Sequence, residues 1–62
     1  MLAQVKRRDL IKLLEENGWY HEREGGKHTV YTNGRETEEI PRHREVNKYT
    51  AKDMIKRRGL RK

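Results

Sequence analysis

A histidine stands where a glycine-rich turn passes into a segment of alternating, strand-like character. His28 follows a Gly-Gly-Lys run at 25–27 and opens a His-Thr-Val-Tyr run at 28–31. Glycines permit the positive φ angles of a tight turn, so the imidazole should lie at a turn-to-strand junction beside Lys27. Histidine titrates near neutral pH and can act as a general base, and a neighbouring cation can stabilise developing negative charge. These two residues therefore suit acid–base chemistry on a phosphate group.

RNA is the phosphate substrate that needs the fewest catalytic groups from the protein, because its own 2′-hydroxyl is the nucleophile that attacks the phosphate. A base for that hydroxyl and cations for the phosphate suffice, and cleavage then leaves a 2′,3′-cyclic phosphate and a 5′-hydroxyl without a metal. The alternative is that His28 is a half-exposed strand histidine with no role. His21 and His43 could donate the proton to the leaving 5′-oxygen, or could be solvated or packing histidines, since the sequence does not fix their distance from His28.

The charge balance favours an anionic partner. The chain carries 16 Lys and Arg against 10 Asp and Glu, a formal net charge of +6. Nucleic acid is the first expectation, although an acidic inhibitor protein could use the same surface. Besides the expected base, the residues expected to contact RNA are cationic or carry an imidazole: Lys6, Arg7, Arg8, Lys27, Arg42 and His43. A further basic cluster at 56–58 could contact RNA, but it is explained equally well by a favourable interaction with the dipole at the end of a helix.

Length and composition limit the other possibilities. We expect one domain spanning residues 1–62, with a thin core, because only 31% of the 62 residues are hydrophobic and 42% are charged. The absence of cysteine excludes disulfides and a thiolate zinc site. No spacing of His, Asp or Glu suggests another metal site, so we expect no metal and no cofactor. No apolar run has membrane-spanning length and no signal peptide is evident, so we expect a cytoplasmic protein.

Hydrophobic periodicity predicts two helices. The first covers 5–17, where Leu10 and Leu14 share a face with further apolar residues and a glycine follows as a stop. The second runs from about Thr50 to Arg58, with a capping-box-like start that uses Asp53 and a glycine cap at 59. The segment between 42 and 49 is expected to be a charged connector.

Three strands are predicted between the helices. They cover 19–23, 28–32 and a third segment from 35 or 36 to Ile40, with an Asn-Gly hairpin at 33–34 before the third and Pro41 ending it. The side chain of His21 is expected to share a strand face with those of Trp19 and Arg23. The predicted fold class is α+β, in the order α-β-β-β-α, with a three-stranded antiparallel sheet and both helices on one of its faces.

The expected core consists of the apolar residues of these elements: Leu10, Leu13, Leu14, Val30, Ile40, Met54 and Ile55. Trp19 and Tyr31 are expected to pack in the core or on the sheet rather than to stack on bases.

Four segments, in order, resemble the HicA toxins. They are residues 6–14 with Asn-Gly-Trp at 17–19, the Gly-Lys-His-Thr-Val-Tyr run at 26–31, Ile-Pro-Arg-His at 40–43, and 50–60 with its terminal Gly-Leu. The resemblance implies a double-stranded-RNA-binding-domain-like fold. It also implies a toxin that cleaves mRNA and is held inactive by a HicB antitoxin, with the family's catalytic histidine at His28.

Three functions are consistent with these features. The first is a metal-independent endoribonuclease toxin, the second a non-catalytic RNA-binding module of the same fold, and the third a protein-interaction module whose basic face serves an acidic partner. Salt-sensitive RNA binding that survives loss of His28, without cleavage, would favour the second. Tight protein binding with negligible RNA affinity would favour the third. The sequence leaves the oligomeric state open.

Overall fold

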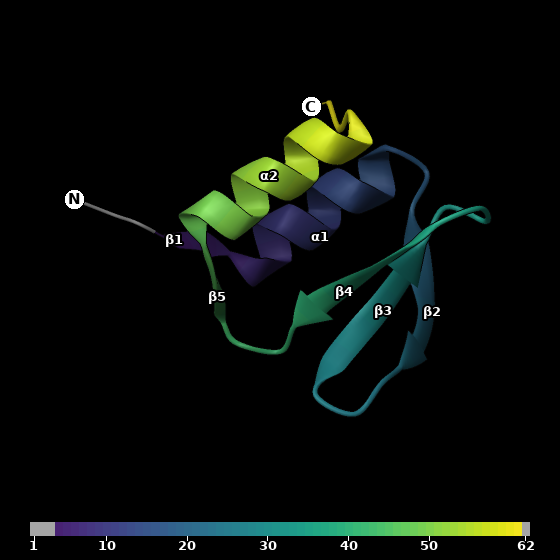
Figure 1. Ribbon diagram of the computed structural model, residues 1–62, viewed down its shortest axis with the longest axis horizontal. Helices are drawn as coiled ribbons and strands as arrows, with labels where there is room; N and C mark the ends of the chain where they lie inside the picture. Colours follow the sequence, from purple (N-terminus) through teal and green to yellow (C-terminus); the bar gives the residue numbers. More distant parts are fainter. Residues whose placement is uncertain (1–3, 62) are drawn as a thin grey trace.

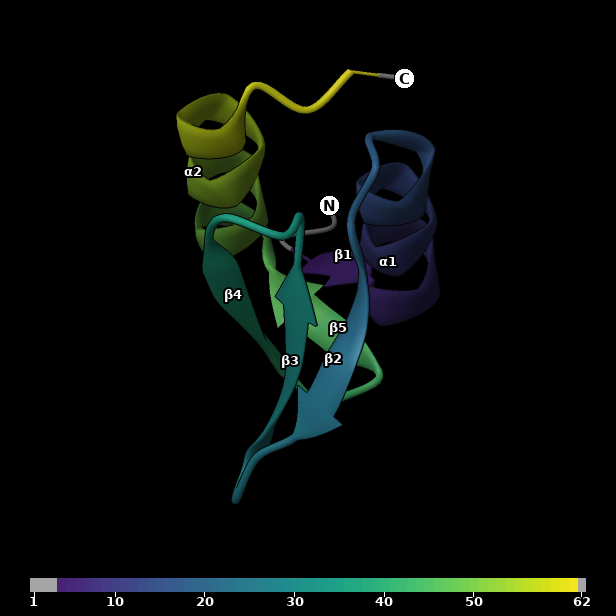
Figure 2. The ribbon, with the colours of Figure 1, turned by 90° about the vertical axis from the view of Figure 1, so that its right-hand side faces the viewer.

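Two helices lie on the same side of a three-stranded antiparallel sheet, as predicted (Figures 1 and 2). The structure, a computed structural model, describes residues 4–61. Its elements are β1 (Gln4–Lys6), α1 (Arg7–Glu16), β2 (Tyr20–Glu24), β3 (His28–Thr32), β4 (Thr37–Pro41), β5 (Glu45–Asn47) and α2 (Lys48–Arg58). The α+β class and the order of the predicted elements are confirmed, and β1 and β5 are additions to them.

The main sheet has the order β2-β3-β4, and its middle strand begins and ends at the predicted residues. The neighbouring strands are each displaced by about a residue from the prediction, as is usual for strand ends. In β4, side chains alternate between exposed and buried, with Glu38 and Ile40 buried. Tyr31, opposite Glu38, belongs to the core beneath the helices. Since neighbouring strand residues face opposite ways, His28 and Val30 lie on the face turned away from the helices.

A bulge in β2 changes which residues share a face. His21 is opposite Tyr31, whereas Arg23 is opposite Val30, with the register shifting between them. Because Val30 and Tyr31 are adjacent in β3, their partners lie on opposite faces. The prediction that His21 and Arg23 share a face is therefore wrong. The His21 ring instead packs edge-on against the ring of Tyr31, with 5.8 Å between centroids.

A second, two-stranded sheet joins the starts of the two helices (Figure 1). β1 and β5 pair antiparallel, with Val5 opposite Val46. Val5 is thus extended rather than helical, and α1 begins at Arg7, two residues later than predicted. The segment expected to be a connector contains β5, and its Val46 is almost fully buried at 2% exposure.

Helix α2 is capped by Asn47 and not by the predicted box at Thr50. The side-chain oxygen of Asn47 accepts hydrogen bonds from the backbone N–H groups of Tyr49 (2.8 Å) and Thr50 (3.4 Å). This places the helix start two residues earlier than predicted, because Asn47 satisfies donors of the first turn. The glycine caps are confirmed: Gly18 has φ +85° and Gly59 has φ +63°.

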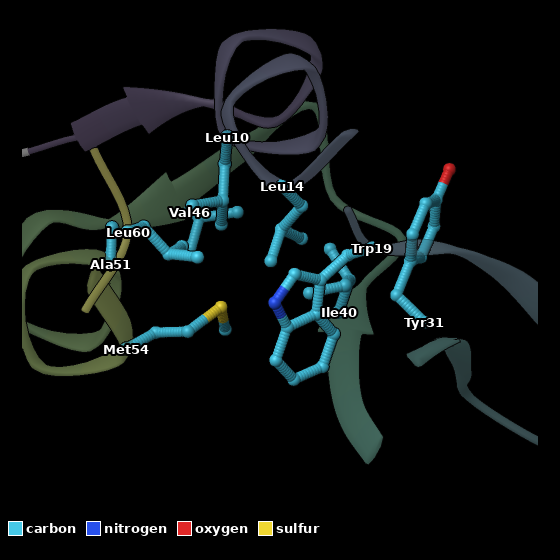
Figure 3. Close-up of a cluster of buried hydrophobic side chains, with 9 residues drawn as sticks. All are labelled: Leu10, Leu14, Trp19, Tyr31, Ile40, Val46, Ala51, Met54 and Leu60. Carbon is cyan, nitrogen blue, oxygen red and sulfur yellow. The ribbon is translucent and has the colours of Figure 1, made fainter. Parts of the chain in front are cut away.

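The core lies between the helices and the sheet (Figure 3). Its members are the buried apolar side chains Leu10, Leu14, Trp19, Tyr31, Ile40, Val46, Ala51, Met54 and Leu60. The predicted core is largely confirmed, including the packing roles of Trp19 and Tyr31. Leu13 and Ile55 are only partly buried at its edge, and Val30 is buried outside this cluster, on the far face of the sheet.

Candidate functional site

His28 begins β3 with its side chain 44% exposed. It is opposite Pro41 of β4, and its Nδ1 lies 4.0 Å from Oε1 of Glu39. That distance is too long for a hydrogen bond, so the carboxylate acts on the ring only through its charge. The imidazole is thus accessible from solvent, while its backbone is fixed by the sheet.

The turn before His28 closes on the histidine's own carbonyl oxygen. The N–H of Gly25 donates to that oxygen at 2.8 Å. A Cβ atom on Gly25 would stand 3.1 Å from the same oxygen, so a larger residue here would push the turn away from the strand. Among the described residues, positive φ occurs at Gly18, Gly34 and Gly59. The turn therefore needs Gly25 for close approach and not for the positive φ that its sequence permits.

Arg42 closes this turn from the end of β4. Its guanidinium donates to the carbonyl oxygens of Gly25 (2.6 Å) and Gly26 (2.8 Å). It also reaches Oε1 of Glu24, at 2.8 Å from Nη2 and 3.1 Å from Nε, and lies 3.4 Å from the carbonyl oxygen of His28. One side chain thereby holds four of the residues from 24 to 28.

Arg7 joins the same region to the start of α1. Its Nε donates to the carbonyl oxygen of Pro41 and its Nη2 to the hydroxyl of Thr29, both at 2.9 Å. The Thr29 hydroxyl in turn donates to Glu24 at 3.1 Å. Two arginines proposed from sequence as phosphate contacts, Arg7 and Arg42, therefore have several of their N–H groups engaged within the protein.

Glu24 is the anion around which these groups gather. A hydrogen bond from His21 Nε2 at 2.8 Å, then those from Arg42, lower the pKa of Glu24 from 4.5 to about 2. Each donor stabilises the charged carboxylate, which is the reason for the direction. Glu24 therefore stays ionised at neutral pH and well into the acid range.

A basic hollow of about 550 Å³ lies beside this network, at the starts of α1 and β5. The residues that line it are Lys6, Arg7, Arg8, Arg42, Arg44 and Glu45. It brings together four of the six residues expected to contact RNA. Lys27, His28 and His43 are not part of its lining, although His43 follows Arg42 directly and is exposed.

Arg44 and Glu45 also line the hollow, and neither is predicted from the sequence as a site residue; Arg44 is the basic one of the two. It lies in the segment treated as a charged connector, where the alternation that would signal a strand is only three residues long. Its carbonyl oxygen accepts the N–H of Arg7 at 2.9 Å, which ties this segment to the first turn of α1. Arg44 itself is exposed at the rim.

The basic cluster at the end of α2 serves the fold instead. Arg57 and Arg58 both donate to Oε2 of Glu38 at 2.6 Å. The hydrogen bonds that Arg57 donates to Asp53, followed by the one it donates to Glu38, raise the pKa of Arg57 above its ordinary value. The Arg58 guanidinium also lies 5.6 Å from the centroid of the Trp19 ring. These charges hold α2 against β4.

The order of these features along the chain agrees with one family. A family model described as the HicA toxin of bacterial toxin–antitoxin systems matches residues 7–60. The chain belongs to the HicA toxin family. The match covers both helices and the whole main sheet, including the turn and histidine at the candidate site. Membership makes the protein a toxin of a toxin–antitoxin system and implies a HicB-type antitoxin as its partner.

No curated protein and no solved structure matches this HicA-family chain. None of the helices within residues 4–61 combines the length and the apolar character that crossing a membrane requires.

Proposed function

We propose that this HicA-family protein is a metal-independent endoribonuclease that cleaves mRNA, with His28 as the general base. The observation that carries the proposal is the exposed imidazole of His28 at the turn held by Arg42, a residue that also lines the basic hollow. Arg42 thereby connects the turn that carries the base to the cationic surface of the hollow. This arrangement supports phosphate chemistry more than it supports either binding alternative, neither of which needs the histidine.

In the proposed reaction, RNA supplies the nucleophile. The neutral imidazole of His28 takes the proton of a 2′-hydroxyl, whose oxygen attacks the adjacent phosphorus. The P–O bond to the 5′-oxygen breaks, giving a 2′,3′-cyclic phosphate and a 5′-hydroxyl. Lys27, which directly precedes His28, stabilises the negative charge of the phosphorane with its ammonium group. The leaving oxygen takes a proton, for which exposed His43 is the candidate donor, because His21 already contacts Glu24.

The basic surface would position the RNA without reading its sequence. Lys6 and Arg8 at the rim of the hollow are exposed and can contact phosphates. Arg7 and Arg42 can add only those N–H groups that their internal hydrogen bonds leave over. A HicB-type antitoxin would then inhibit by covering His28 or by competing for this surface, in the cytoplasm where mRNA is found.

Cleavage of a long single-stranded RNA in EDTA tests the proposal. The intact protein should produce fragments with 2′,3′-cyclic phosphate ends, and an RNA with a single 2′-deoxy nucleotide 5′ to a mapped cleavage site should resist cleavage there. RNA binding that weakens with salt, without any cleavage, would instead establish the non-catalytic RNA-binding module. Cleavage of the 2′-deoxy site would refute the proposed nucleophile.

A further inference from the structure

We propose that Arg42 is a positioning residue, which fixes the turn that carries His28 and thereby sets the place of the imidazole. The inference rests on the proposed function in so far as it concerns catalysis. The structural part concerns the turn alone and can be tested without RNA. We call the contacts of Arg42 with residues 24–28 the turn clamp.

The turn clamp uses the shape of a guanidinium. Nη1 donates to the carbonyl oxygen of Gly26, while Nη2 donates to that of Gly25 and to Glu24. Nε donates to the same Glu24 oxygen. These donors point in different directions within one plane, which an arginine supplies and a lysine does not. The charge on Glu24 strengthens the two bonds that it accepts.

The turn has few other means of holding its shape. Gly25 and Gly26 have the largest conformational freedom of any residue type. A Cβ atom on Gly26 would meet nothing within 4 Å, so this residue stands in open space. The His28 ring itself has the charge of Glu39 at 4.0 Å as its ionic contact. The turn clamp therefore limits the motion of the backbone immediately before the imidazole.

The clamp is itself anchored. Arg42 follows Pro41, whose carbonyl oxygen accepts from Arg7 at 2.9 Å. Pro41 is also opposite His28 in the sheet. Arg7 thus fixes one end of the clamp against α1, and Arg42 carries that constraint across to the turn, 14 to 18 residues away in sequence.

A phosphate contact and a positioning role predict different consequences for Arg42. A residue that only attracts phosphate raises KM when removed, and lysine largely replaces it because charge is what counts. A positioning residue lowers kcat when removed, because a displacement of about 1 Å at a reacting group can cost on the order of 100-fold in rate. Lysine does not replace it, since one ammonium cannot bridge Glu24 and two carbonyl oxygens.

The test compares Arg42→Gln and Arg42→Lys with Arg35→Gln. Arg35 is an exposed arginine at the hairpin at the opposite end of the sheet, so its loss changes the net charge equally. Two measurements are made on each folded variant: kcat and KM for RNA cleavage, and hydrogen exchange of the Gly25 amide, which donates to His28.

We expect both Arg42 variants to lower kcat by roughly 10- to 100-fold with a smaller change in KM. Exchange at Gly25 should rise at least about tenfold in both, the equivalent of 1.4 kcal/mol in local opening, and stay unchanged in Arg35→Gln. If Arg42→Lys restores kcat, or if Gly25 exchange is unaltered in the Arg42 variants, the proposal that Arg42 positions the turn is wrong. If the intact protein does not cleave RNA, the proposed function fails, and the exchange measurement alone still decides whether Arg42 holds the turn.

Discussion

Arg58 and Glu38 form an ion pair that is largely withdrawn from water. The Arg58 Nε donates to Glu38 Oε2 at 2.6 Å, with the side chains 16% and 9% exposed. Such a pair is costly to break on one side, because the remaining charge stays buried without its partner. The pair fastens the end of α2 to β4, which supports the strand opposite His28. The basic end of α2 is thus a structural element of this toxin.

Substituting Glu38→Gln should therefore destabilise the protein by about 2 kcal/mol. The loss is smaller than for a fully buried pair because Arg58 keeps a second partner in Glu36 at 3.0 Å. For a domain of this size we expect the melting temperature to fall by roughly 8–16 °C. Thermal unfolding followed by circular dichroism measures it. Glu39→Gln in the same strand, whose side chain is 72% exposed, is the matched control and should change stability by less than about 0.5 kcal/mol. Equal losses in both variants would contradict the role of the buried pair.

Helix α2 offers a test of where its cap lies. Asn47→Ala should cost about 1 kcal/mol, because the first-turn N–H groups of Tyr49 and Thr50 lose their acceptor. Thr50→Ala should have a much smaller effect, since Thr50 lies within the helix and not at its cap. Urea unfolding of the two variants measures both. A larger loss for Thr50→Ala would restore the cap that the sequence suggested.

The lowered pKa of Glu24 predicts a dependence of stability on acid. The pKa of the Glu24 carboxyl is about 2 in the folded protein and near 4.5 in the unfolded chain. The contribution of this carboxylate to the free energy of unfolding is therefore complete above pH 4.5 and disappears as the pH falls towards 2. The difference in unfolding midpoint between the intact protein and Glu24→Gln should accordingly be present at neutral pH and close between pH 4.5 and 2. High salt should narrow it, because the Glu24 side chain is 56% exposed. A difference that stays constant down to pH 2 would contradict this assignment.

Arg44 tests the basic hollow as an RNA-binding surface. Arg44→Ala should weaken binding of a non-cleavable 2′-deoxy oligonucleotide and reduce the slope of log affinity against log salt by about 0.7, the value for one lost phosphate contact on a single strand. Arg35→Ala, which removes the same charge away from the hollow, should leave the slope unchanged. Fluorescence anisotropy across a salt series provides both slopes. Equal reductions would mean that net charge, and not the hollow, governs binding.

Local patterns in the sequence predict most of this fold. The leucines of α1, the Asn-Gly hairpin and the glycine after α2 each act within a few residues, and each prediction is confirmed. The pairing of Val5 with Val46 joins segments 41 residues apart through strands of three residues, too short to show a period. The local pattern therefore predicts too early a start for α1 and a connector where β5 lies.

The candidate site divides in the same way. The glycine turn and His28 can be recognised in the sequence, because the turn at 25–27 is directly followed by His28, the first residue of β3. The turn clamp cannot be predicted from the sequence, because Arg42 contacts Glu24 from a distant part of the chain. The residues next to Arg42 do not distinguish an arginine that holds a turn from one that binds phosphate. The bulge between His21 and Arg23 is equally hidden, because it depends on how β2 pairs with β3.

The rate of RNA cleavage by His28→Ala is the most direct test of the account. Single-turnover cleavage of one RNA in EDTA should slow by about 10²- to 10⁴-fold relative to the intact protein, the contribution of a positioned general base. The two proteins should have the same circular dichroism spectrum and melting temperature within a few degrees, because the His28 side chain is 44% exposed. Equal rates for the two proteins, purified identically, would show that His28 is not the base and that this account of the site is wrong.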